Sequence, residues 1–207
     1  MTRFCLLTLA MVWPVLAQSL DKAEESRRAR EEYGRLLYHP QRDPWQMPEQ
    51  VIRALAIKPG ETIATVEDSA GYFARRFARE AGRVYLVSGD LATLQYASKE
   101  KPPNLETIRA LPTDPKLGSR TVDTIFLCNA LTIIRERPAY YALLARSLSP
   151  QGRIVVIDFF KQNPPPGIAA EGRITEDSIT KEMAAAGFRK IQRFDFLPFQ
   201  FFVVFAR

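Results

Sequence analysis

Histidine and cysteine are almost absent from this chain of 207 residues, which has one histidine, His39, and two cysteines, Cys5 and Cys128. A zinc site of the usual kind needs several histidine or cysteine ligands, so the composition excludes one and we expect no metal site. Cys5 lies in a segment that we expect to be removed, which leaves one thiol and no partner for an internal disulfide. Cys128 lies in an apolar run and is interpreted as a small buried hydrophobe rather than a nucleophile.

Apolar runs long enough to span a membrane are also lacking. The stretch from Phe4 to Leu16 is interrupted by Pro14 and falls short of the roughly 20 residues that a spanning helix needs. Thr2 and Arg3 precede this stretch, and Val15–Ala17 resembles a signal-peptidase cleavage site. The pattern predicts a signal peptide over residues 1–17, hence an exported, periplasmic or secreted protein without a membrane span in its mature chain. An uncleaved anchor or a buried helix is the alternative.

The charge pattern gives little sign of a nucleic-acid partner. Lys and Arg number 29 against 23 Asp and Glu, a formal net charge of +6. The basic residues near the start alternate with glutamates, as on a solvated helix face, and aromatic side chains do not interleave with basic ones along a groove. The positive balance weakly favours an anionic ligand or surface, and the oligomeric state is not indicated.

Apolar β-branched runs alternate with helical patterns through the middle of the chain. Pro40, Pro44 and Pro48 are expected to stiffen an extended connector, with Pro48 opening a helix to Leu55. A tight turn with Gly71 opens a second helix, whose buried face holds Phe73, Phe77 and Ala81. Further helices are expected over Leu91–Ser98 and Pro138–Leu148. The predicted strands are Thr62–Val66, Val84–Val87, Leu105–Ala110, Thr121–Cys128 and Arg153–Ile157. This rhythm predicts a parallel α/β sheet with right-handed crossovers.

The tail of the chain changes period. Thr175–Ala186 is expected to be a helix with Thr175 as its cap and Gly187 as its stop, followed by strands Phe188–Asp195 and Phe199–Phe205. The short link between these strands implies an antiparallel pair at one edge of the sheet. The expected organisation is a signal peptide over 1–17, an N-terminal helical segment and connector over 18–56, and a three-layer α/β domain of about seven strands over 57–207.

Three short motifs resemble those of the class I S-adenosylmethionine-dependent methyltransferases. Lys58–Val66 followed by Gly71–Ala78 is similar to the family's first strand, glycine loop and first helix. Ser149–Asp158 resembles its entry to strand five, and Ala185–Phe188 its approach to strand six. The resemblance runs from about Pro44 to Arg207. Within the family, the chain is similar to a subgroup whose members carry secretion signals. It implies a Rossmann-like methyltransferase fold, S-adenosyl-L-methionine as the cofactor, and methyl transfer to an unidentified small-molecule or exported acceptor.

The resemblance also implies where the cofactor binds, with a glycine-rich motif that is degenerate here. Glu67 and Ser69 stand where family members have glycines, and Ser88 stands where they have an acidic residue at the end of strand two. Asp90 is expected to replace that acidic residue as acceptor for the ribose hydroxyls. The implied cofactor-binding residues are Glu67, Ser69, Gly71, Ser88, Asp90, Thr113, Asp114 and Asn129.

Asp158 follows the fifth predicted strand at the carboxyl edge of the sheet, where open α/β sheets bind ligands. It is the candidate acid or base on the substrate side, and a capping or loop-satisfying aspartate is the alternative. Gly71 and Asn129 have structural alternatives as well, as a helix-start glycine and a turn residue. The rival function is a catalytically degenerate methyltransferase-like domain that serves as an exported binding or structural module.

Overall fold

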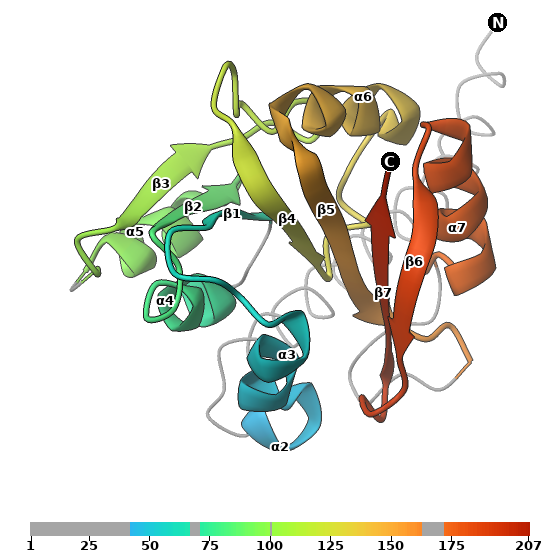
Figure 1. Cartoon of the computed structure of the whole chain (residues 1–207), viewed down its shortest axis with the longest axis horizontal. Helices are drawn as coiled ribbons and strands as arrows, with labels where there is room; N and C mark the ends of the chain where they lie inside the picture. Colours follow the sequence, from blue (N-terminus) through green and yellow to red (C-terminus); the bar gives the residue numbers. More distant parts are fainter. Residues whose placement is uncertain (1–41, 67–70, 100, 163–171) are drawn as a thin grey trace, which may run out of the picture.

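The computed structural model describes residues 42–66, 71–99, 101–162 and 172–207. The predicted signal peptide and the residues Glu67 and Ser69 lie outside these ranges. The described residues form a seven-stranded sheet with the order β3-β2-β1-β4-β5-β7-β6, which Figure 1 shows from left to right. The strands are β1 (Thr62–Val66), β2 (Arg83–Ser88), β3 (Leu105–Arg109), β4 (Val122–Cys128), β5 (Leu148–Phe159), β6 (Arg189–Phe194) and β7 (Gln200–Ala206).

The sheet is parallel except for β7, which runs antiparallel to both β5 and β6. In sequence order the helices are α2 (Asp43–Gln46), α3 (Pro48–Leu55), α4 (Tyr72–Phe77), α5 (Leu91–Ser98), α6 (Arg137–Ser147) and α7 (Glu176–Ala185). The predicted α/β class, the mostly parallel sheet and the antiparallel C-terminal pair are therefore confirmed. Along the sequence most strands are separated by helices, because parallel neighbours need a crossover connection.

Two hydrophobic clusters cover the two faces of the sheet. In β1, Ile63 packs with α3, α4 and α5, whereas its neighbour Ala64 packs with α6 and α7. Successive side chains of a strand point to opposite faces, so each strand contributes to both clusters. Because α3 packs in the same cluster as α4, the connector region is attached to the domain core.

The two strands of the C-terminal hairpin differ in the exposure of their side chains. β6 forms one edge, and most of its side chains are exposed, including Arg189, Lys190 and Arg193. β7 lies inside the sheet, and its run Phe201–Phe205 is buried throughout. The hairpin thus pairs a polar edge strand with an apolar inner strand. Thr175 caps α7 as predicted, because its hydroxyl accepts a hydrogen bond from the Ser178 backbone N–H, and Gly187 follows with a φ of 84°.

Three elements differ from the prediction by more than one residue at an end. The connector expected to be extended holds the short helix α2, because Pro44 fits the first turn of a helix and Met47 turns the chain with a φ of 47°. α4 ends at Phe77, so Ala81 is buried beyond the helix rather than on it. β5 begins at Leu148 rather than Arg153, because Leu148 pairs with Val122 of β4 before a register shift.

None of the helices in the described ranges is long and apolar enough to cross a bilayer. Within the same ranges, His, Cys, Asp and Glu side chains do not gather in threes around a common metal position.

Candidate functional site

The candidate site lies at the carboxyl edge of the sheet, around the ends of β1 and β4. β1 pairs in parallel with β2 on one side and with β4 on the other, so the direction of the strand order changes here. Open α/β sheets bind ligands in the crevice that such a reversal creates. The residues that follow β1, β2, β3 and β4 include every candidate cofactor residue named from the sequence.

Gly71 opens α4 in the left-handed conformation, with a φ of 70°. A Cβ atom added there would lie 3.4 Å from the Cβ of Ala97 and 3.5 Å from a methyl group of Leu86. These are ordinary van der Waals distances, so the positive dihedral angle rather than a close approach of α5 or β2 favours glycine here. The structure places Gly71 as the N-cap residue that leads the chain into α4.

Ser88 is the last residue of β2, and Asp90, two positions further on, is the N-cap of α5. The Ser88 hydroxyl accepts a hydrogen bond of 3.1 Å from the Asp90 backbone N–H. The Asp90 carboxylate caps α5: it accepts bonds of 3.2 Å and 2.9 Å from the backbone N–H groups of Ala92 and Thr93, and one of 2.7 Å from the Thr93 hydroxyl. Asp90 therefore stabilises the helix N-terminus, and its role toward a ribose stays a prediction.

Thr113 and Asp114 lie in a turn after β3, closed by the bridge between Leu111 and Asp114. The Asp114 carboxylate accepts a 2.8 Å bond from the Lys116 backbone N–H and pairs with its ammonium at 2.8 Å. These contacts hold the pKa of Asp114 below its usual value. Thr113 and Leu111 are exposed beside it, so this turn presents one polar and one apolar side chain to solvent.

Asn129 follows β4 directly and has a positive φ of 56°, a conformation that asparagine tolerates better than most residues. Its side-chain oxygen accepts a 2.8 Å hydrogen bond from the amide nitrogen of Gln200, the first residue of β7. Its own amide nitrogen is buried and has no hydrogen-bond partner among the residues that the structure describes. Buried polar groups are rarely left without a partner, so this donor calls for an acceptor.

Two further buried side chains extend this contact away from the sheet. The amide nitrogen of Gln46 in α2 donates a 2.6 Å bond to the Gln200 side-chain oxygen. The Arg42 guanidinium donates bonds of 3.3 Å and 3.2 Å to the Gln46 side-chain oxygen. We call Arg42, Gln46, Gln200 and Asn129 the amide relay. Arg42 also lies 3.9 Å from the ring centre of Tyr72, which fixes the relay against α4.

Asp158 lies in β5, beside the segment that follows β4, and is 2% exposed. One carboxylate oxygen accepts bonds from the Phe159 backbone N–H at 2.8 Å and from Arg173 at 3.2 Å. The other accepts a 3.2 Å bond from the backbone N–H of Leu131. Burial raises the pKa of Asp158, and Arg173 and the two backbone donors oppose that rise. This geometry favours the alternative of a loop-satisfying aspartate, and a role as acid or base stays a prediction.

Comparison with known proteins agrees with this architecture. Residues 69–156 match the family model described as the methyltransferase domain. A SAM dependent methyltransferase from Aquifex aeolicus has 22% sequence identity and a TM-score of 0.77, over 84% of this chain and 96% of that one. The fold is that of a class I methyltransferase.

Two further solved structures share this methyltransferase fold. An S-adenosylmethionine dependent methyltransferase from Mesorhizobium loti has 16% identity and a TM-score of 0.65, over 76% of this chain and 96% of that one. The DhpI-SAM-HEP complex has 16% identity and a TM-score of 0.66, over 91% of this chain and 97% of that one. No curated protein matches the sequence significantly.

The residues at the carboxyl edge of this methyltransferase fold fit S-adenosylmethionine in one respect. The amide nitrogen of Asn129, buried and without a hydrogen-bond partner among the described residues, needs an acceptor, and the cofactor can supply one. The fold brings six of the candidate cofactor residues to one edge, because they end or follow neighbouring parallel strands: Gly71, Ser88, Asp90, Thr113, Asp114 and Asn129.

The sequence did not lead us to Arg42, Gln46 and Gln200. Arg42 and Gln46 lie in the connector, which we expected to be extended, and Gln200 opens an apolar strand. The available signal was composition: Gln200 stands between Phe199 and Phe201, and a polar residue in an apolar strand needs a partner when it is buried.

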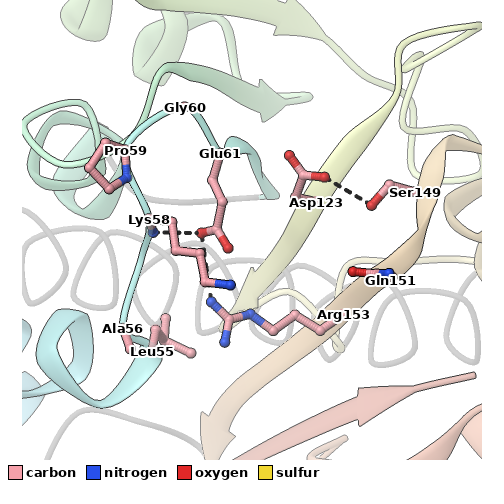
Figure 2. Close-up of a pocket in the computed structure, with 10 residues that line it drawn as sticks. All are labelled: Leu55, Ala56, Lys58, Pro59, Gly60, Glu61, Asp123, Ser149, Gln151 and Arg153. Carbon is pink, nitrogen blue, oxygen red and sulfur yellow. Dashed lines mark hydrogen bonds and ion pairs between the residues drawn. The ribbon is translucent and has the colours of Figure 1, made fainter.

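A cavity of about 540 Å³ lies at the opposite, amino edge of the sheet. Figure 2 shows residues that line it. Its carboxylates are already bound: Asp123 accepts 2.9 Å bonds from the Thr62 backbone N–H and the Ser149 hydroxyl. Glu61 accepts a 3.3 Å bond from the Lys58 backbone N–H and lies 3.7 Å from Arg153. These contacts join β1, β4 and β5, so we interpret the cavity as part of the framework.

Proposed function

We propose that the protein is an S-adenosylmethionine-dependent methyltransferase that acts on an unidentified small or exported acceptor. The observation that carries the proposal is the buried side-chain donor of Asn129, which has no partner within the described part of the chain. It lies at the reversal of strand order, where a fold of this kind binds its ligand. The match of residues 69–156 to the methyltransferase domain and the likeness to structures named for S-adenosylmethionine support the same reading.

Methyl transfer asks mainly for alignment of two reactants. The bound cofactor supplies an activated methyl group, and the protein contributes by holding the acceptor in line with it and by excluding water. Gly71 and Asn129 are proposed to hold the amino-acid portion of the cofactor, with Ser88 and Asp90 on the ribose and Thr113 and Asp114 on the adenine. We also propose Glu67 and Ser69, which follow β1 in the sequence, as cofactor-binding residues.

Export is proposed from the sequence of residues 1–17. If the signal peptide is cleaved, the mature protein begins at Gln18 and fractionates with exported proteins. Mass spectrometry of the purified protein, together with cell fractionation, tests both points. An intact N-terminus in the cytoplasmic fraction would contradict them.

Calorimetric titration with S-adenosylmethionine and with S-adenosylhomocysteine tests the function. We expect saturable heat with both ligands and a rise in the unfolding temperature, because a ligand that binds only the folded state stabilises it. ATP serves as the control for unspecific nucleotide binding. Absence of both heat and thermal shift at millimolar cofactor would contradict the proposed methyltransferase function and favour a binding or structural module.

A further inference from the structure

The amide relay is a buried chain of side chains that connects α2 to the end of β4. Arg42, Gln46, Gln200 and Asn129 are 1%, 0%, 1% and 5% exposed. Three contacts join them in that order, from guanidinium to amide to amide to amide. Burying an amide costs free energy unless it is hydrogen-bonded. Packing alone therefore does not explain a line of buried amides that ends at the carboxyl edge of the sheet.

The direction of the relay follows from its first member. A guanidinium can only donate hydrogen bonds, so the Gln46 atom that faces Arg42 is the oxygen. The Gln46 nitrogen therefore faces Gln200 and meets its oxygen, and the Gln200 nitrogen meets the oxygen of Asn129. Each amide thus fixes the orientation of the next. The chain ends with the Asn129 nitrogen as a donor that cannot turn into an acceptor.

The place of this donor along the sheet identifies the part of the ligand it faces. In the order β3-β2-β1-β4, the predicted adenine residues follow β3 and the predicted ribose residues follow β2. Asn129 follows β4, at the far end of this row, so it faces the methionine portion of a cofactor laid across the row. That portion carries an ammonium and a carboxylate, and only the carboxylate can accept a bond from a fixed N–H.

We propose that Asn129 donates to the carboxylate of the cofactor's methionine portion, and that Arg42, Gln46 and Gln200 are positioning residues that fix this polarity. The inference rests on the proposed function. It assigns to α2 a part in cofactor recognition, since two of its positions, Arg42 as N-cap and Gln46 as last residue, set the orientation of an amide at the end of β4.

Titration with two ligands that differ in one group tests the proposal. S-adenosylmethionine and its decarboxylated analogue share every feature except the carboxylate. We expect the wild-type protein to bind the analogue at least about tenfold more weakly, the factor that a bond to a charged group typically contributes. We expect Asn129→Asp, which keeps the oxygen and replaces the donor, to lose at least about tenfold in affinity for S-adenosylmethionine and less than about twofold for the analogue.

Gln200→Met tests the positioning role without adding charge. It removes the bond that orients Asn129 while contacting no ligand atom, so it should reduce the preference for S-adenosylmethionine over the analogue by several-fold. Gln192→Met, an exposed substitution on the same hairpin, is the matched control and should leave both affinities unchanged. Thermal unfolding identifies any variant that has lost its fold. The comparison of the two ligands on the wild-type protein tests recognition of the carboxylate without any variant.

The outcomes separate the inference from the function beneath it. Equal wild-type affinity for the two ligands, or an equal loss of both in Asn129→Asp, would overturn the inference while leaving the proposed function standing. Wild-type protein that binds neither ligand would overturn both. A preference for S-adenosylmethionine that survives Gln200→Met would show that the relay does not set the polarity.

Discussion

Replacement of Asp158 by asparagine should destabilise the protein by about 3 to 5 kcal/mol, the range for breaking a buried ion pair from one side. The carboxylate accepts three bonds, from Phe159, Leu131 and Arg173. An asparagine oxygen can face Phe159 and Arg173 only if its nitrogen faces the Leu131 N–H. One buried backbone donor is then unpaired, at about 1 to 3 kcal/mol, and the bond to Arg173 loses its charge. The first loss falls on the segment after β4, which holds Leu131, and the second on Arg173, which precedes α7.

Urea unfolding followed by circular dichroism measures this change, provided that the variants keep the slope of the wild-type transition. Arg173→Met should also be destabilising, because Asp158 then remains buried without its cation. The double variant should lose less than the sum of the two, with a coupling energy of about 0.5 to 3 kcal/mol. Burial raises the pKa of Asp158 and Arg173 opposes that rise, so the cost of Arg173→Met should shrink as the pH falls, because the buried carboxyl can then take up a proton.

An Asp158→Asn variant within about 1 kcal/mol of the wild type would refute the reasoning, because a loop-anchoring pair cannot be lost without cost. Strictly additive effects of Asp158→Asn and Arg173→Met would also contradict it. A stable Asp158→Asn variant that binds S-adenosylmethionine normally yet has lost methyl transfer would revive the acid or base role.

Three further predictions follow from the described contacts. Glu182 accepts bonds of 2.8 Å and 2.7 Å from Arg137, which hold its pKa below the ordinary value, so Glu182→Gln should cost about 1 kcal/mol at neutral pH. That cost should vanish as the pH falls through the lowered pKa of Glu182, because the ion pair stabilises only the ionised form. Unfolding curves of both proteins from neutral to acidic pH measure this change. A difference in unfolding free energy that stays constant with pH would contradict the prediction. Asp90→Ala should lose about 1 kcal/mol of helix capping whereas Asp90→Asn should lose less, and cofactor titration of both variants shows whether the charge also serves the ribose; equal stability of both variants would contradict the cap. Gly71→Ala should lose about 1 kcal/mol in thermal unfolding and weaken cofactor binding, because alanine is strained at a φ of 70°; a variant as stable as the wild type would argue against the strain.

Most of the fold could be predicted because its signals are local. The apolar β-branched runs marked the first five strands of the chain, β1 to β5. The bounds of α3 and α5 agree residue by residue with the predicted helices Pro48–Leu55 and Leu91–Ser98. Proline at the start of one helix and a capping aspartate before the other are chemical marks that need no tertiary contact. α2 was missed because a run with three prolines suggests an extended chain, although each of two prolines fits a helical first turn.

The candidate site was only partly predictable, because its bonds join residues far apart in the chain. The edge at which Gly71, Asp90 and Asn129 meet follows from parallel topology and was expected. The amide relay joins Gln46 to Gln200 across 154 positions, which no spacing rule within one element reveals. The contacts of Asp158 depend likewise on where Leu131 and Arg173 come to lie, so the sequence left its two roles open.

The place of β7 in the sheet has a consequence for how the chain folds. β7 follows β6 in the sequence but lies between β5 and β6, so β6 cannot join the sheet until β7 has been synthesised. Until then the backbone edge of β5 that pairs with β7 is open to contacts with other chains, and so is the apolar run Phe201–Phe205 until it has paired. A chain that reaches this point slowly or is held unfolded would therefore depend on assistance during its final step, and aggregation of the newly made protein would begin at β7.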